Sequence, residues 1–284
     1  MITDNFAVFI LTHGRPNQVF TYSTLKKAGY TGDIYIIVDD EDSKKNEYFE
    51  VFGDQVIIFS KKEISMKFDE ADNFDDRRSI VYARNACFDI AKDLGIEYFM
   101  QLDDDYVNFF FKYDGSGYSN QSINKNLDEI INLYLKYYKS INAKSIAMAQ
   151  NGDFIGGAVN DMPFSINRRR KAMNTFICST NRRFYFKGRI NEDVNTYTHN
   201  SSIGDLFLTI PVISINQKTT QSSKGGMTDI YLDNGTYVKS FYTILFMPSA
   251  VKIGLMGDNH RRLHHKINWK YCVPKIINEE LKKK

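Results

Sequence analysis

Four short apolar runs in the first third of the chain predict buried β-strands, at residues 6–11, 33–38, 55–59 and 98–102. Uniformly apolar runs of this length are typical of parallel strands that are covered on both faces. Residues 17–28 follow a Gly and a Pro that can start a helix. Residues 75–94 place apolar side chains at helical spacing before Gly95. The order of these elements predicts an α/β domain with a mostly parallel central sheet flanked by helices.

The remainder of the chain has a less regular pattern. It predicts a loop, a helix and two strands, at residues 114–120, 122–140, 145–149 and 206–215. A polar stretch with two glycines, residues 217–228, predicts a loop, and two further apolar segments lie at 242–246 and 250–255. No internal repeat is visible. We therefore expect one domain over residues 1–284, with a first half at 1–110 and a second half at 111–284.

Three consecutive carboxylates, Asp103, Asp104 and Asp105, follow the apolar run at 98–102. Adjacent like charges raise one another's pKa, so a chain keeps them together with a compensating cation or with full solvation. The end of a buried strand is poorly solvated, and hard oxygen ligands there suit Mg²⁺ or Mn²⁺ with a phosphate-bearing substrate. An acidic loop without a ligand is the alternative. The segment 12–15 and Asp39 also follow predicted strands, and ligands gather at the carboxyl ends of such strands.

The composition excludes several classes of protein. A hydrophobic content of 43% with 14% aromatic residues is enough for a core and excludes a disordered chain. The three cysteines are isolated and have no CxxC spacing, which excludes a zinc or disulfide framework and indicates reduced thiols. The apolar run at 6–11 is too short to cross a membrane and no basic region precedes it, so we expect a soluble, cytoplasmic protein with no membrane partner.

Charge is divided unevenly along the chain. Residues 1–160 contain 17 Lys and Arg against 25 Asp and Glu, whereas residues 161–284 contain 20 against 9. The net charges are therefore −8 and +11. A basic half joined to an acidic half indicates that the basic half meets a polyanion, although a solvated basic face is the common alternative.

Five elements in order resemble those of GT-A fold glycosyltransferases. They are Thr12-His13-Gly14-Arg15, Asp39, Ala83-Arg84-Asn85-Ala86, Asp103-Asp104-Asp105 and Asn191-Glu192-Asp193. The resemblance covers about the first two-thirds of the chain. It implies a GT-A (Rossmann-like) fold with an acceptor-side C-terminal part, and transfer of a sugar from a nucleotide sugar, UDP-linked, to a hydroxyl group. The basic second half makes the chain most similar to phage-type enzymes that act on hydroxymethylated pyrimidines in DNA.

The resemblance also implies roles for individual residues. The nucleotide sugar is expected at Thr12, His13, Arg15, Asp39, Arg78, Arg84, Asn85, Asp103 and Asp104. Mn²⁺ or Mg²⁺ is expected at Asp103, Asp105 and His260, with His264 and His265 competing for the last place. Asp193 is the expected base that takes the proton from the acceptor hydroxyl, with Glu192 beside it.

Each role has a plainer alternative. Asp39 could be an ordinary loop carboxylate, Arg84 a residue on the helix surface and Asn85 a ligand of loop backbone. Asn191 could be the N-cap of a helix whose first turn holds Glu192 and Asp193.

The acceptor is expected to be DNA, bound by Arg168, Arg169, Arg170 and Arg261 with neighbouring aromatic side chains for stacking. A polysaccharide or protein acceptor is the second hypothesis. A nucleotidyltransferase is the third, but the glycine-rich loop usual in that class is missing after the first strand. A non-catalytic nucleic-acid-binding protein would leave the acidic triplet unexplained.

Overall fold

A computed structural model describes residues 1–154, 172–218, 230, 233, 235, 237–257 and 261–272. Its described strands are β1 (Phe6–Leu11), β2 (Asp33–Asp39), β3 (Val56–Phe59), β4 (Tyr98–Asp103), β5 (Tyr106–Asp114), β6 (Gly117–Ser122), β7 (Ser145–Gln150), β8 (Phe176–Ser179), β9 (Phe207–Gln217), β10 (Val251–Met256) and β11 (Arg262–Ile267). The described helices are α1 (Phe20–Lys27), α2 (Lys45–Phe52), α3 (Lys61–Ser65), α4 (Val81–Asp93), α5 (Leu127–Ser140), α6 (Glu192–Ser202) and α8 (Val238–Phe246), with short 3-10 turns at Pro16–Gln18, Gly53–Gln55, Asn151–Phe154 and Thr180–Arg182.

Nine of these strands form one sheet in the order β3-β2-β1-β4-β8-β7-β9-β5-β6. Strands β1 to β4 are parallel to one another, and the pairings give only β5 and β8 the opposite direction among the nine. The predicted fold class, a mostly parallel α/β sheet flanked by helices as in GT-A enzymes, is confirmed. Strands from the second half of the chain lie between β4 and β5, so both halves contribute to the same sheet.

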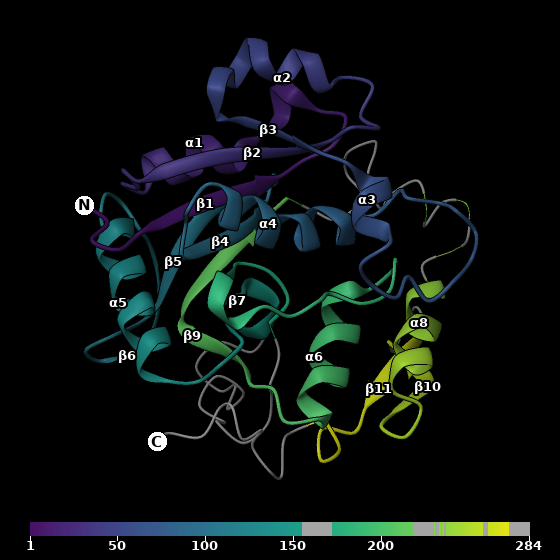
Figure 1. Ribbon diagram of the computed structural model, residues 1–284. Coiled ribbons are helices and arrows are strands. Elements are labelled where there is room, and N and C mark those ends of the chain that lie inside the picture. The colour runs from purple at the N-terminus through teal and green to yellow at the C-terminus, as the bar shows by residue number, and fades with distance from the viewer. Residues whose placement is uncertain are drawn as a thin grey trace.

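Helices cover both faces of the sheet (Figure 1). Phe6, Val8 and Ile10 of β1 face a core shared with α5, whereas Ala7, Phe9 and Leu11 face a second core shared with α4 and α6. This alternation follows from the period of two in a strand. It explains why β1 is apolar at every position, as expected for a strand buried on both sides.

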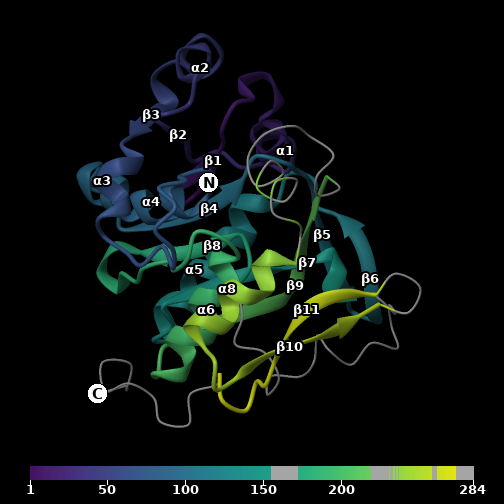
Figure 2. The same cartoon turned by 90° about the vertical axis from the view of Figure 1, so that its right-hand side faces the viewer.

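A separate two-stranded antiparallel sheet, β10 and β11, lies beside α8 and α6 (Figure 2). Trp269, just after β11, stacks on Tyr197 of α6 with ring centroids 5.6 Å apart and an interplanar angle of 14°. The side chain of Asn191 donates to Thr243 Oγ1 of α8 at 2.6 Å. The start of α6 is therefore bound to α8, and the middle of α6 packs against the segment that follows β11.

Several elements differ from the prediction. The predicted loop at 114–120 is mostly strand: only Gly115 and Ser116 form the turn of a β-hairpin, because β5 ends at Asp114 and β6 begins at Gly117. The apolar segment at 242–246 is the end of helix α8. Strand β9 contains Pro211 at a shift in register, where Met148 pairs with Ile210 and Ala149 with Ser214. Such a bulge accommodates a proline that cannot donate to the ladder. Most of the predicted loop at 217–228 lies outside the described residues.

Within the described ranges, every helix is too short or too polar to cross a membrane.

Candidate active site

The acidic triplet forms a tight turn between β4 and β5. Leu11 of β1 pairs with Asp103 of β4, which brings Thr12 next to the triplet. Thr21 of α1 holds the backbone of the turn: its Oγ1 donates to the Asp103 carbonyl at 2.5 Å and accepts from the Tyr106 amide at 3.0 Å. The Thr21 amide donates to the Asp104 carbonyl at 3.1 Å. Helix α1 thus fixes the directions in which the three carboxylates point.

The three carboxylates have different partners. Asp103 Oδ1 accepts from Arg84 Nη2 at 2.8 Å. Asp104 is buried, and its Oδ2 accepts from Thr12 Oγ1 at 2.6 Å and from Arg15 Nε at 2.8 Å. Asp105 Oδ1 is buried and has no hydrogen-bond partner. A buried carboxylate oxygen without a partner is costly, so Asp105 is the member of the triplet whose charge the protein leaves uncompensated.

The environment of Asp105 favours binding of a cation. Burial, followed by the charges of Asp103 and Asp104, raises the pKa of Asp105 to about 7. A divalent cation would remove both causes, since it replaces lost hydration and offsets the neighbouring charges. Mg²⁺ is usually held by one or two carboxylates together with substrate phosphates and water. Asp103 and Asp105 therefore fit such an ion.

Among the described residues, no third protein ligand lies at this position. In the ranges that the structure covers, no group of three or more His, Cys, Asp and Glu side chains is arranged to hold a metal ion. His260 lies outside the described residues. His264 and His265 lie on β11, where their rings stack with centroids 4.2 Å apart. Burial, then His264 and Lys239, lowers the pKa of His265 to about 4.

Arg84 joins the triplet to the predicted catalytic pair. It is buried in α4, and besides Asp103 it donates from Nε to Glu192 Oε1 at 3.0 Å. Its guanidinium also lies 4.9 Å from the ring centre of Phe176. Burial opposes the charge, but Asp103 and Glu192 outweigh it and raise the pKa of Arg84. One permanently charged side chain therefore spans two acidic groups that are far apart in the sequence.

Glu192 and Asp193 occupy the first turn of α6. Burial, then the charge of Glu192, raises the pKa of Asp193 well above its ordinary value. Asn191 precedes the helix in a left-handed conformation with φ 63°, and its side chain binds Thr243 instead of capping α6. The predicted helix start is present, but capping by the Asn191 side chain is not.

On the other side of the triplet, the segment 12–15 is held by Asp39, Lys61 and Tyr48, of which the last two were not predicted from the sequence. His13 Nδ1 lies 2.7 Å from Asp39 Oδ2, and Lys61 Nζ lies 2.9 Å from Asp39 Oδ1. Burial favours the neutral acid, but His13 and Lys61 overcome it and lower the pKa of Asp39. The Tyr48 hydroxyl accepts from the Arg15 amide at 2.9 Å. Asp39 is therefore an ionised anchor for His13, whose side chain is 40% exposed.

Two of the predicted nucleotide ligands have other partners. Asn85 is buried, and its amide binds the backbone of Phe186 through both ends, at 3.0 and 2.8 Å. Arg78 is exposed and binds Asp76 and Asp233. Among the described residues, Arg78 makes no contact with the acidic triplet. Arg168, Arg169 and Arg170 lie outside the described residues, and Arg261 is exposed beside β11.

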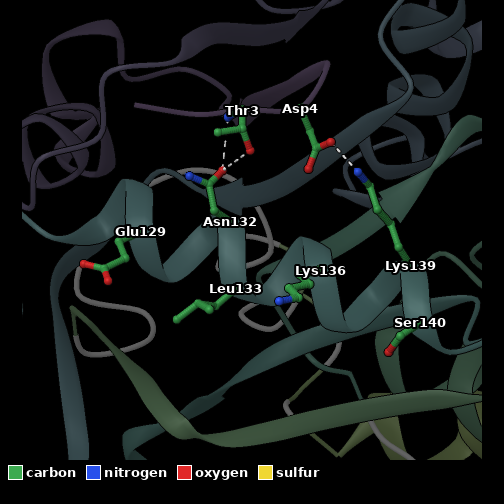
Figure 3. A pocket seen from close by; sticks show the side chains of 8 residues that line it. All are labelled: Thr3, Asp4, Glu129, Asn132, Leu133, Lys136, Lys139 and Ser140. Carbon is green, nitrogen blue, oxygen red and sulfur yellow. Dashed lines mark hydrogen bonds and ion pairs between the residues drawn. The ribbon is translucent and has the colours of Figure 1, made fainter.

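A surface pocket lies at the opposite end of β1 (Figure 3), lined by Thr3, Asp4, Glu129, Asn132, Leu133, Lys136, Lys139 and Ser140. Its lining comes from the N-terminal segment and α5, and Lys139 is paired with Asp4 across it. It contains none of the predicted site residues, and the carboxyl ends of β1 and β4 point away from it. The candidate active site is therefore not this pocket. It is the edge of the sheet where β1 and β4 end in the segment 12–15 and the triplet Asp103–Asp105, which we call the acidic edge.

The chain is similar to several solved structures at low sequence identity. Residues 1–349 of S. aureus TarS, in complex with UDP-GlcNAc, are 10% identical with a TM-score of 0.43, and the match covers 84% of this chain and 66% of that one. Glucosyl-3-phosphoglycerate synthase from Mycobacterium tuberculosis, with Mn²⁺ and UDP-glucose, is 8% identical with a TM-score of 0.43, covering 93% of this chain and 90% of that one. The mannosyltransferase PcManGT from Pyrobaculum calidifontis, with GDP-Man and Mn²⁺, is 10% identical with a TM-score of 0.46, covering 87% and 74%.

Family membership is decided by sequence. No curated protein matches the chain. The model of the TET-associated glycosyltransferase family matches residues 6–226, which is well over half of the chain and includes the acidic triplet and Glu192-Asp193. The chain therefore belongs to the TET-associated glycosyltransferase family, and it is a glycosyltransferase.

Proposed function

We propose that the protein transfers a sugar from a UDP-sugar to a hydroxyl group of its acceptor with the help of Mn²⁺ or Mg²⁺. The observation that carries this proposal is the unpartnered, buried Oδ1 of Asp105 beside Asp103 at the carboxyl end of β4. A divalent cation held there would neutralise the charge that develops on the leaving nucleoside diphosphate.

The donor side of the reaction is assigned to the segment 12–15. Asp39 fixes Nδ1 of His13, so the exposed part of the His13 ring, and not Asp39 itself, faces the base. Arg15 is held by Asp104 and supplies positive charge near the phosphates. Since both groups are fixed before the donor arrives, little entropy is lost in ordering them.

The acceptor side is assigned to Asp193, with Glu192 and Arg84 as positioning residues. The raised pKa of Asp193 brings this carboxyl closer to the pH at which a general base works well. Asp193 takes the proton of the acceptor hydroxyl. The hydroxyl oxygen attacks C1 of the sugar, and the bond between C1 and the diphosphate oxygen breaks. Arg84 is bound to Glu192 and Asp103, so it couples the position of the base to the position of the donor.

We assign DNA with a hydroxymethylated pyrimidine as the acceptor. The net charge of +11 on residues 161–284, which include Arg168, Arg169, Arg170 and Arg261, supports a polyanionic partner.

The direct test is transfer to DNA. Three duplexes are compared, with 5-hydroxymethylcytosine, with 5-hydroxymethyluracil and with neither. Each is incubated with UDP-glucose and Mn²⁺ and digested to nucleosides, and the nucleoside masses are measured by mass spectrometry. A hexose added only to a hydroxymethylated nucleoside is expected. Equal transfer to the duplex without a hydroxymethyl group, or transfer only to a polysaccharide or protein, would contradict the assignment of hydroxymethylated DNA as the acceptor.

The predicted acceptor residues are tested by DNA binding as a function of salt. Changing Arg168, Arg169 and Arg170 together to Ala should reduce the slope of log K against log salt by about 2.7, since each lost phosphate contact contributes about 0.9. An unchanged slope would remove this cluster from the acceptor site.

A further inference from the structure

The β10–β11 hairpin is an exposed basic ribbon. Lys252, Arg262 and Lys266 are exposed on its strands, with Arg261 and Lys270 at its two ends. Residues 250–257 and 261–272, which contain the whole described hairpin, include no Asp or Glu. A surface that is only kept in solution usually mixes both signs of charge. The described residues of this ribbon carry charge of a single sign.

The lysines of the ribbon face one another. Lys252 and Lys266 are directly opposite in the antiparallel register, and like charges in that position destabilise a pair of strands. Lys266 also lies over Gly254, where an added Cβ would meet its side chain at 2.5 Å. The two ammonium groups are therefore kept on one small face without an acidic partner on either strand. A polyanion that lies along this face would relieve their repulsion.

An apolar side chain lies on the same face as this charge, where β10 leads into β11. Met256 is 39% exposed and pairs with Arg262, whereas Leu255 and Leu263 point to the other face of the ribbon. A two-stranded antiparallel ribbon has the dimensions to enter the major groove of duplex DNA. Apolar side chains can contact bases or wedge between them, while flanking Lys and Arg bind phosphates.

The ribbon is fixed relative to the proposed catalytic base. Trp269 at the end of β11 stacks on Tyr197 of α6. Helix α8 packs against β10, β11 and α6, and its Thr243 accepts from Asn191, which precedes Glu192 and Asp193. Figure 2 shows the ribbon, α8 and α6 side by side. A duplex held by the ribbon would therefore be held at a constant position relative to Asp193.

We propose that the β10–β11 ribbon is the docking element for the duplex around the target base, with Lys252, Arg262 and Lys266 on the phosphates and Met256 at the groove. This assignment rests on the proposed function in one respect, namely that the acceptor is DNA. It adds a binding surface that is separate from the acidic edge. Because the ribbon contacts phosphates, it binds modified and unmodified duplexes alike.

The test compares two triple variants with the wild type. The ribbon variant carries Lys252→Ala, Arg262→Ala and Lys266→Ala. The matched control carries Lys27→Ala, Lys62→Ala and Lys92→Ala, three exposed lysines in the acidic half. Binding of a fluorescent duplex is measured by anisotropy from 50 to 200 mM salt. The ribbon variant should lose about 2.7 from the slope of log K against log salt, whereas the control should keep the wild-type slope.

Donor binding separates this assignment from the proposed function. Both variants should bind UDP with Mn²⁺ as the wild type does, because the acidic edge is intact. DNA binding that is equal in the wild type and the ribbon variant would overturn the docking role while leaving glycosyl transfer standing. Equal losses in the two variants would overturn it as well, because they would show only the effect of net charge. Loss of binding to anionic vesicles but not to DNA would assign the ribbon to a membrane surface instead.

Discussion

Arg84 Nη2 lies 2.8 Å from Asp103 Oδ1, and this contact connects helix α4 to the end of strand β4. The same guanidinium donates to Glu192, so the donor and acceptor sides of the site share one buried cation. Without Arg84, Asp103 would be a partly buried negative charge close to Asp105. Glu192 would likewise be a partly buried negative charge close to Asp193.

Replacing Arg84 by Met should therefore destabilise the fold by about 3–5 kcal/mol, the usual cost of removing one partner of a buried ion pair. Chemical denaturation gives this number directly. The double variant with Arg84→Met and Glu192→Gln should recover part of the loss, because it removes one of the two stranded charges. Equal stability of Arg84→Met and the wild type would show that the guanidinium is not needed to hold the two elements together.

Asp105 should make the stability of the metal-free protein depend on pH. Its folded pKa of about 7 lies above the ordinary value of about 3.9. The folded state therefore holds its proton more tightly than the unfolded state. Stability should fall as the pH rises from about 4 to about 7. Asp105→Asn should flatten this dependence and raise the melting temperature at neutral pH. A wild-type melting curve that is insensitive to pH in this window, or an identical slope in the variant, would contradict the assigned environment.

Asp193→Asn should lower kcat by about 10²–10⁴, the range that general-base assistance supplies. The dissociation constant of the UDP-sugar should stay unchanged, because the donor side is intact. Since Glu192 contributes to the raised pKa of Asp193, Glu192→Gln should shift the acid limb of the pH–rate profile to lower pH. A loss confined to donor affinity would move Asp193 out of the acceptor site.

Asn85 is expected to act on the fold and not on the nucleotide. Asn85→Ala would leave both the amide and the carbonyl of buried Phe186 without partners. Each unsatisfied group costs about 1–3 kcal/mol. The variant should therefore unfold at lower denaturant concentration, yet bind UDP like the wild type while folded. Weaker UDP binding with unchanged stability would restore the nucleotide role that the resemblance implies.

The sequence predicted the acidic edge of the sheet well, because uniformly apolar strands such as Phe6–Leu11 are unmistakable and their carboxyl ends lie together. It did not predict the hairpin of β5 and β6, since Gly117–Ser122 is a polar edge strand without an apolar alternation. It also could not separate helix from strand in the short apolar segment that became α8.

Within the site, the sequence identified the carboxylates but not how each is neutralised. Thr21, Tyr48 and Lys61 carry no motif, and only the fold brings them to the triplet and to Asp39. Arg78 and Arg84 are near neighbours in the sequence with similar claims to a phosphate. Arg84 lies in α4, where it is buried together with all the residues from Val81 to Phe88, whereas Arg78 precedes the helix and is exposed.

The central claim is that Asp103 and Asp105 hold a divalent cation together with a nucleoside diphosphate. The measurement that tests it most directly is the melting temperature of the wild type and Asp105→Asn with UDP, with Mn²⁺ and with both. Ligands that bind the folded state stabilise it by about 2.7 kcal/mol at a hundred times the dissociation constant. We expect UDP and Mn²⁺ together to raise the wild-type melting temperature by more than the sum of their separate effects, and Asp105→Asn to lose this excess. An excess that is equal in the variant, or no stabilisation by any nucleoside diphosphate with Mn²⁺, would contradict the account.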